Sequence, residues 1–123
     1  MTKPIALIVE DNPQLNKIFS ITLQADFATE ICSDGDSALA RLAEIVPAIV
    51  ILDLHLPTTS GKEILMYIRS EARLADTRII ICTADERQAQ SLEDEADIVL
   101  LKPVSPAQLR QIASRFTHEQ SVP

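Results

Sequence analysis

Four short runs of aliphatic residues recur along the chain, and their length and spacing restrict the fold more than any other feature. Each run holds four or five residues, rich in Ile, Val and Leu, and polar residues follow it. Such runs are typical of strands buried on both faces of a parallel sheet. They occupy residues 5–9, 48–52, 79–82 and 98–101. Residues 28–32 give a weaker signal, which we interpret as a further strand.

Segments with apolar residues at helical spacing lie between and after these strands. They cover residues 13–24, 36–46, 62–70, 85–96 and 106–116. Asn12 is placed to cap the first helix and Ser105 the last, and Pro13 suits the first helical position. The alternation of strands and helices, with right-handed crossovers, predicts an α/β fold with a doubly wound parallel sheet. The residues alone do not fix the order of the strands.

Length and composition indicate one ordered domain, residues 1–116, followed by residues 117–123 as a polar tail or the start of a linker. The formal net charge of −7 argues against direct nucleic-acid binding, because that needs clustered Lys and Arg. No apolar run approaches the roughly 18–20 residues of a membrane span, and no signal peptide is evident. We therefore expect no membrane insertion and a cytoplasmic location.

Several classes of cofactor site are disfavoured by the residue counts. The chain has two glycines and no Gly-rich phosphate loop, so we expect no bound nucleotide. Its two cysteines, Cys32 and Cys82, lie in or beside apolar runs, and we interpret both as small core residues. A zinc site would need more ligands at closer spacing.

Polar residues stand where the four aliphatic runs end. The acidic pair Glu10 and Asp11 follows the first run, Asp53 the second, Thr83 the third and Lys102 the fourth. In an open α/β sheet, ligands bind outside the carboxyl ends of the strands. Three carboxylates, a hydroxyl and an ammonium are therefore expected to converge on one edge, and this set of groups suits phosphoryl transfer.

The order of these motifs resembles one family. The acidic pair comes first, then Asp53 with Leu-His-Leu-Pro behind it and Gly61 further on, then Thr83-Ala84, then Lys102-Pro103. From residue 5 to about 116, the chain resembles a receiver domain of bacterial two-component response regulators, of the chemotaxis-regulator type. The resemblance implies a flavodoxin-like (βα)5 fold with strand order 2-1-3-4-5. It also implies that Cys32 and Cys82 are too far apart for a disulfide.

The resemblance implies a phosphoacceptor signalling domain of a two-component or phosphorelay system. Asp53 would take a phosphoryl group from a phosphohistidine on a histidine kinase or histidine phosphotransfer protein. Asp11 and Asp53 would bind Mg²⁺ directly, Glu10 through water, and His55 through its backbone carbonyl. Such a domain is not an enzyme acting on other molecules, because it catalyses only its own phosphorylation and dephosphorylation. It stands alone or is excised from a larger response regulator or hybrid kinase.

Two more site residues take their roles from the resemblance. Lys102 would pair with Asp53 beforehand and with the phosphoryl oxygens afterwards, and a cis Lys102–Pro103 peptide would turn it inward. Thr83 would donate a hydrogen bond to a phosphoryl oxygen and move inward after transfer. The small Ala84 beside it would leave room for the phosphoryl group.

The chain departs from the family pattern at one switching position. Many receivers carry Tyr or Phe three residues before the lysine, where this chain has Val99. We hypothesise that the output signal is muted, or is carried by movement of residues 83–96. His55 and Asp85 occupy positions that flank the phosphoryl group in the family, and we hypothesise that they set its lifetime. Histidine side chains ordinarily titrate near neutrality, so this lifetime is expected to depend on pH.

The family also suggests a partner surface, formed by the fourth helix, the fifth strand and the fifth helix. Arg87, Arg110 and Arg115 are candidates for contacts with a downstream target there, and a homodimer is left open. Two alternatives remain at this point. One is a receiver-like interaction module that works without phosphate. The other is a haloacid-dehalogenase-type phosphatase, which normally has a second Asp where this chain has His55.

Overall fold

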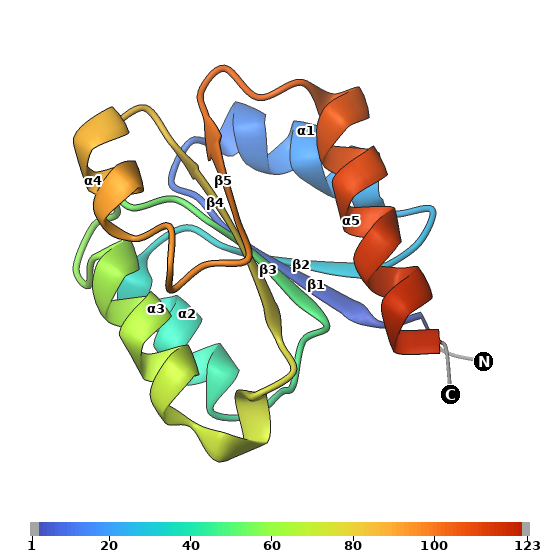
Figure 1. Ribbon diagram of the computed structural model, residues 1–123, viewed down its shortest axis with the longest axis horizontal. Helices are drawn as coiled ribbons and strands as arrows, with labels where there is room; N and C mark the ends of the chain where they lie inside the picture. The colour runs from blue at the N-terminus through green and yellow to red at the C-terminus, as the bar shows by residue number, and fades with distance from the viewer. Residues whose placement is uncertain (1–2, 122–123) are drawn as a thin grey trace.

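A five-stranded parallel sheet with helices on both faces forms the molecule (Figure 1). The computed structural model describes the backbone of residues 3–121 and the side chains of residues 3–117. The strands are β1 (Ile5–Val9), β2 (Ala28–Cys32), β3 (Ile49–Leu52), β4 (Arg78–Thr83) and β5 (Ile98–Leu101). Their order, β2-β1-β3-β4-β5, confirms the flavodoxin-like prediction.

The central strands explain the aliphatic runs. Every residue of β3 is buried, and β4 is buried from Ile79 to Thr83. Strands covered on both faces bury every side chain, so a continuous aliphatic run replaces an alternating pattern. β1 and β3 pair in register from Ala6 opposite Ile49 to Val9 opposite Leu52, so their carboxyl ends lie level.

The helices form two layers, which Figure 1 shows on either side of the sheet. α1 (Pro13–Leu23) and α5 (Pro106–Ser121) cover one face, and Phe19 and Leu109 belong to that core. α2 (Gly35–Leu42), α3 (Gly61–Ser70) and α4 (Glu86–Ser91) lie over the other face, with a short 3-10 helix, η1 (Ala72–Leu74), after α3.

Three helices end four or five residues away from the predicted position. α2 stops at Leu42 and leaves Val46 exposed, because the Arg73 guanidinium in η1 donates to the carbonyls of Leu42 and Ile45. α4 stops at Ser91 instead of continuing to residue 96. α5 runs on to Ser121, so the segment expected as a tail from residue 117 begins as helix. Residues 122–123 lie outside the described part.

The predicted helix caps at Asn12 and Ser105 are confirmed, and so is the prediction that both cysteines are small core residues. The Asn12 side chain accepts hydrogen bonds from the N–H groups of Gln14 and Leu15 at the start of α1. Cys32 and Cys82 are buried free thiols on β2 and β4, with two strands between them. Among the described residues, no helix is both long and apolar enough to cross a membrane.

Candidate functional site

The carboxyl edge of the sheet gathers the predicted site residues. Glu10 follows β1, Asp53 follows β3, Thr83 ends β4 and Lys102 follows β5. Their backbones are fixed by sheet-like hydrogen bonds. The Asp53 N–H donates to the Val9 carbonyl at 2.9 Å, and the Lys102 N–H donates to the Thr83 carbonyl at 2.8 Å. The strands thus bring residues 92 positions apart in the chain to one place.

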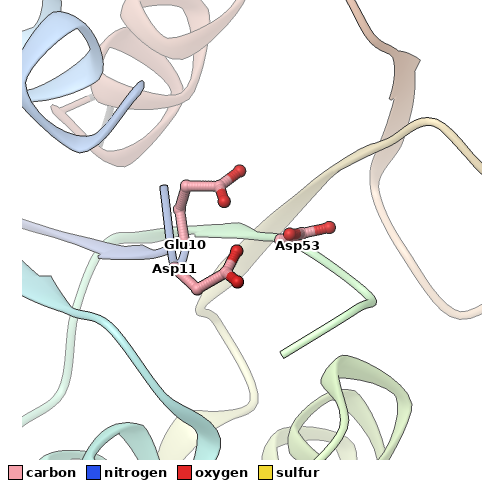
Figure 2. Close-up of side chains that lie close together, drawn as sticks. All are labelled: Glu10, Asp11 and Asp53. Carbon is pink, nitrogen blue, oxygen red and sulfur yellow. The ribbon is translucent and has the colours of Figure 1, made fainter. Parts of the chain in front are cut away.

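Three carboxylates form a cluster at this edge (Figure 2). One oxygen from each of Glu10, Asp11 and Asp53 lies within 4.8 Å of the others. Glu10 and Asp53 are 2% and 5% exposed, whereas Asp11 is exposed to solvent. Carboxylate oxygens are the donors that Mg²⁺ prefers, and Mg²⁺ takes only a few of them while keeping several waters. A cluster with one open side therefore fits that ion.

Lys102 opposes the negative charge of the cluster. Its Nζ lies 2.7 Å from Glu10 Oε1 and 3.5 Å from Asp53 Oδ2, so it pairs more closely with Glu10 than with the predicted partner Asp53. Burial raises the pKa of Glu10, although the hydrogen bond from Lys102 offsets part of this rise. Burial acts to lower the pKa of Lys102, but Glu10 and Asp53 outweigh it and hold this pKa above the ordinary lysine value. The cis Lys102–Pro103 peptide is confirmed.

The turn between β1 and α1 holds the acidic pair. The Asn12 N–H donates to Glu10 Oε2 at 3.0 Å, and Nδ2 of Asn16 donates to the Glu10 carbonyl at 2.6 Å. Asn16 is 3% exposed, on the buried face of α1. We did not predict this residue. A polar residue on the apolar face of a predicted helix was the available signal, because a buried amide requires a hydrogen-bond partner.

The loop after Asp53 is pressed against the site. The His55 N–H donates to Asp53 Oδ1 at 3.3 Å, and the Gly61 N–H donates to the Leu54 carbonyl at 3.0 Å. A Cβ atom on Gly61 would lie 2.1 Å from the Asp53 carbonyl oxygen. Glycine is required here by the close approach of α3 to the backbone of Asp53.

A second loop approaches the site from β4. Thr83 is fully buried, and its Oγ1 accepts a hydrogen bond from the Asp85 N–H at 3.1 Å. Asp85 caps α4 through the Gln88 N–H, and its Oδ2 lies 3.2 Å from His55 Nε2. The hydrogen bond from Gln88, with a smaller contribution from His55, lowers the pKa of Asp85. His55 and Asp85 therefore bridge the two loops that follow Asp53 and Thr83.

The residues predicted for switching and for partner contacts lie on α4, β5 and α5. Val99 on β5 is half-buried and packs against the core under α2, α3 and α4. Arg87, Arg110 and Arg115 are exposed. Nothing in the structure tests their predicted contacts.

Known proteins match this chain along most of its length. The response regulator receiver domain family matches residues 6–114. The chain is 29% identical to the DNA-binding response regulator MtrA of Mycolicibacterium smegmatis, over 95% of this chain and 52% of MtrA. It is 32% identical to the sensor histidine kinase TmoS of Ectopseudomonas mendocina, over 93% of this chain and 12% of TmoS. The chain thus spans about half of the first relative and a small part of the second.

Solved structures agree with the sequence match. The BeF3-activated DrrB receiver domain superposes with a TM-score of 0.86 at 26% identity, over 95% of this chain and 99% of that one. TrrA of Thermotoga maritima, in complex with Mg²⁺ and BeF, superposes with a TM-score of 0.81 at 25% identity, over 94% of this chain and 99% of that one. With the strand order and the polar sheet edge, these matches lead to one conclusion: the chain belongs to the response regulator receiver domain family, the phosphoacceptor signalling domains of two-component systems.

Proposed function

We propose that Asp53 is the phosphoacceptor and that it takes its phosphoryl group from a phosphohistidine on a histidine kinase or histidine phosphotransfer protein. The observation that carries this proposal is the cluster of Glu10, Asp11 and Asp53 oxygens within 4.8 Å, with the Lys102 ammonium against it. Phosphoryl transfer asks the protein mainly for positioning and for neutralisation of charge. This edge of the sheet supplies both.

The transfer exchanges one bond to phosphorus for another. A carboxylate oxygen of Asp53 attacks phosphorus as the P–N bond to the donor histidine breaks, and the departing imidazole keeps the electron pair and takes up a proton. Asp11 and Asp53 would hold Mg²⁺ directly, with Glu10 through water and His55 through its carbonyl. Bound there, the ion supplies positive charge opposite the phosphoryl oxygens.

Lys102 and Thr83 would complete the neutralisation. The Lys102 ammonium already lies 3.5 Å from Asp53 Oδ2, so it can follow the negative charge onto the phosphoryl oxygens. The Thr83 hydroxyl accepts the Asp85 N–H, so its own proton remains available for donation to a phosphoryl oxygen. Ala84, which follows Thr83, is small and would leave room for the phosphoryl group.

His55 and Asp85 are proposed to set how long the phosphoryl group lasts. Their side chains bridge the two loops beside Asp53, where water must approach to hydrolyse the acyl phosphate. His55→Ala removes this bridge, and we expect the variant to lose its phosphoryl group several-fold faster than the parent protein. Intact mass, recorded over time after removal of the phosphodonor, measures this loss. A lifetime equal to that of the parent protein would remove the pair from control of hydrolysis.

We also propose an output surface and a location for the domain. The domain would change only its own phosphorylation state and pass the signal through α4, β5 and α5 to a downstream target, in the cytoplasm. Arg87, Arg110 and Arg115 are the proposed contacts on that surface.

The decisive experiment is intact mass after incubation with Mg²⁺ and acetyl phosphate, beside an Asp53→Asn control. We expect one phosphoryl adduct that requires Mg²⁺ and is missing from the control, because an amide oxygen is a poor nucleophile. An adduct that persists in Asp53→Asn would move the acceptor elsewhere. No adduct, even with a histidine-phosphorylated donor protein, would favour an interaction module that works without phosphate.

A further inference from the structure

Both glycines of the chain lie against the loop that follows Asp53, residues 54–60. A Cβ atom on Gly61 would meet the Asp53 carbonyl oxygen, as described above. A Cβ atom on Gly35, at the start of α2, would lie 1.8 Å from the Thr59 carbonyl oxygen. Neither glycine has a positive φ, so conformational freedom is not their role. They allow the loop to be held closely between the starts of α2 and α3.

The position in this loop that would suit glycine is Thr58. Its φ of 66° is the one positive value among non-glycine residues of the described chain. A β-branched residue in this region is strained, and such strain persists only where surrounding contacts impose it. The side chain explains why threonine is tolerated, since Thr58 Oγ1 accepts the Asp36 N–H at 3.0 Å. Glycine would relieve the strain but could not accept this bond.

Two further hydrogen bonds join the loop to the first turn of α2. The Gly35 N–H donates to the Pro57 carbonyl at 3.0 Å, and Thr59 Oγ1 donates to Asp36 Oδ1 at 2.5 Å. We call these three hydrogen bonds the loop latch. α2 has its own N-cap, because Asp34 accepts from the Ser37 N–H at 2.7 Å. The Thr58 hydroxyl also hydrogen-bonds to the Asp34 carboxylate, so this side chain joins the loop to the cap as well as to the first turn of α2.

We propose that Thr58 and Asp36 are positioning residues for the phosphoryl site, acting through this latch. Neither belongs to the carboxylate cluster. The loop they fix carries His55, whose N–H donates to Asp53 Oδ1 and whose carbonyl is the proposed Mg²⁺ ligand. The latch thus sets both the orientation of the Asp53 carboxylate and the place of a metal ligand. This inference rests on the proposed function and adds to it residues from α2, an element that contributes nothing else to the site.

Thr58→Gly and Thr58→Ser separate positioning from stability. Glycine removes the acceptor and gives the unfolded chain more freedom, but it also relieves the strain at φ 66°, so the free energy of unfolding should change little. Serine keeps Oγ1. We expect Thr58→Gly to weaken Mg²⁺ binding and to slow phosphorylation by acetyl phosphate, each roughly 10-fold, as for other residues that orient metal ligands. Thr58→Ser should match the parent protein in both.

Four readouts decide the outcome: Mg²⁺ affinity by calorimetry, phosphorylation rate by intact mass, urea unfolding, and amide exchange of His55 in the metal-free protein. If the latch positions the loop, the His55 amide should exchange its hydrogen faster in Thr58→Gly than in the parent protein, while the free energy of unfolding changes little. Parent-like exchange, Mg²⁺ affinity and phosphorylation rate in Thr58→Gly would overturn the inference. If the parent protein binds Mg²⁺ but does not become phosphorylated, the proposed function fails. The latch is then tested separately, by comparing Mg²⁺ affinity and His55 amide exchange between Thr58→Gly and the parent protein.

Discussion

Among single residues, Lys102 has the most direct chemical consequence. Its ammonium lies between Glu10 and Asp53, and after transfer it would stabilise the phosphoryl oxygens. We expect Lys102→Ala to slow phosphorylation roughly 100-fold, as loss of one preorganised donor commonly does. The measurement is a mass time course at saturating Mg²⁺ and acetyl phosphate. Lys62→Ala, an exposed lysine on α3, is the matched control, and equal rates in the two variants would remove Lys102 from the chemistry.

The reactivity of the two cysteine thiols tests how tightly the core is packed around single residues. Burial raises the pKa of Cys82 to about 12 and holds the pKa of Cys32 above the ordinary thiol value. The thiolate is the reactive form, so near pH 8 the folded protein should react slowly with a disulfide reagent, and both thiols should react quickly in urea. In the Cys32→Ser variant, Cys82 is the remaining thiol, so the reaction rate of this variant is that of Cys82. Native reaction as fast as in urea would show that these strands open readily.

The residues that could be predicted are those whose position follows from the end of a strand. Glu10, Asp53 and Thr83 lie where the sequence placed them, because aliphatic runs mark strand ends clearly. Asn16 and the Thr58–Asp36 contact were not predicted. The latch joins positions 22 apart, and no local pattern records which backbone groups two loops will bring together. Lys102 was predicted at the site, but its closer pairing with Glu10 depends on tertiary packing.

Helix ends were less predictable than strands at the scale of elements. The periodicity of α4 suggested a helix to residue 96, but residues 93–95 are Glu-Asp-Glu, and acids at a helix C-terminus oppose its dipole. Arg69 Nε donates to the Glu95 carbonyl at 2.7 Å and holds this segment as a turn. Strand order depended on the family resemblance, because several parallel sheets satisfy the same alternation of elements.

α4 and β5 are also where switching can be tested. Val99 has no ring to move inward, so we expect Mg²⁺ with a beryllofluoride phosphoryl mimic to shift resonances of residues 83–96 while changing those around Val99 little. Backbone chemical shifts with and without the mimic measure this. Asp53→Asn with the same additions shows which shifts come from the ions alone. Large chemical-shift changes centred on Val99 would contradict the hypothesis that the output signal through β5 is muted.

At the scale of the whole molecule, the fold brings three negative charges together, and their mutual repulsion lowers the stability of the metal-free protein. The sheet brings Glu10, Asp11 and Asp53 within 4.8 Å, and one ammonium, that of Lys102, opposes them. Each pair of like charges at this distance costs on the order of 1 kcal/mol when it is screened with the dielectric constant of bulk water, as we expect for the exposed Asp11. Removal of one of these charges should therefore stabilise the metal-free protein while it damages function, the trade-off common at active sites.

Asp11→Asn tests this balance. Without Mg²⁺, we expect its free energy of unfolding to exceed that of the parent protein by about 1 kcal/mol, because one repulsive charge is gone. With Mg²⁺ at ten times its dissociation constant, the parent should gain about 1.4 kcal/mol, and the variant much less, so their order reverses. Urea unfolding by circular dichroism, with chelator or with Mg²⁺, measures all four values. Asp76→Asn, an exposed aspartate before β4 at the opposite end of the sheet, should respond to neither condition. If Asp11→Asn were less stable than the parent without Mg²⁺, the carboxylate would have a structural role, and repulsion within the cluster would not limit the stability of the fold.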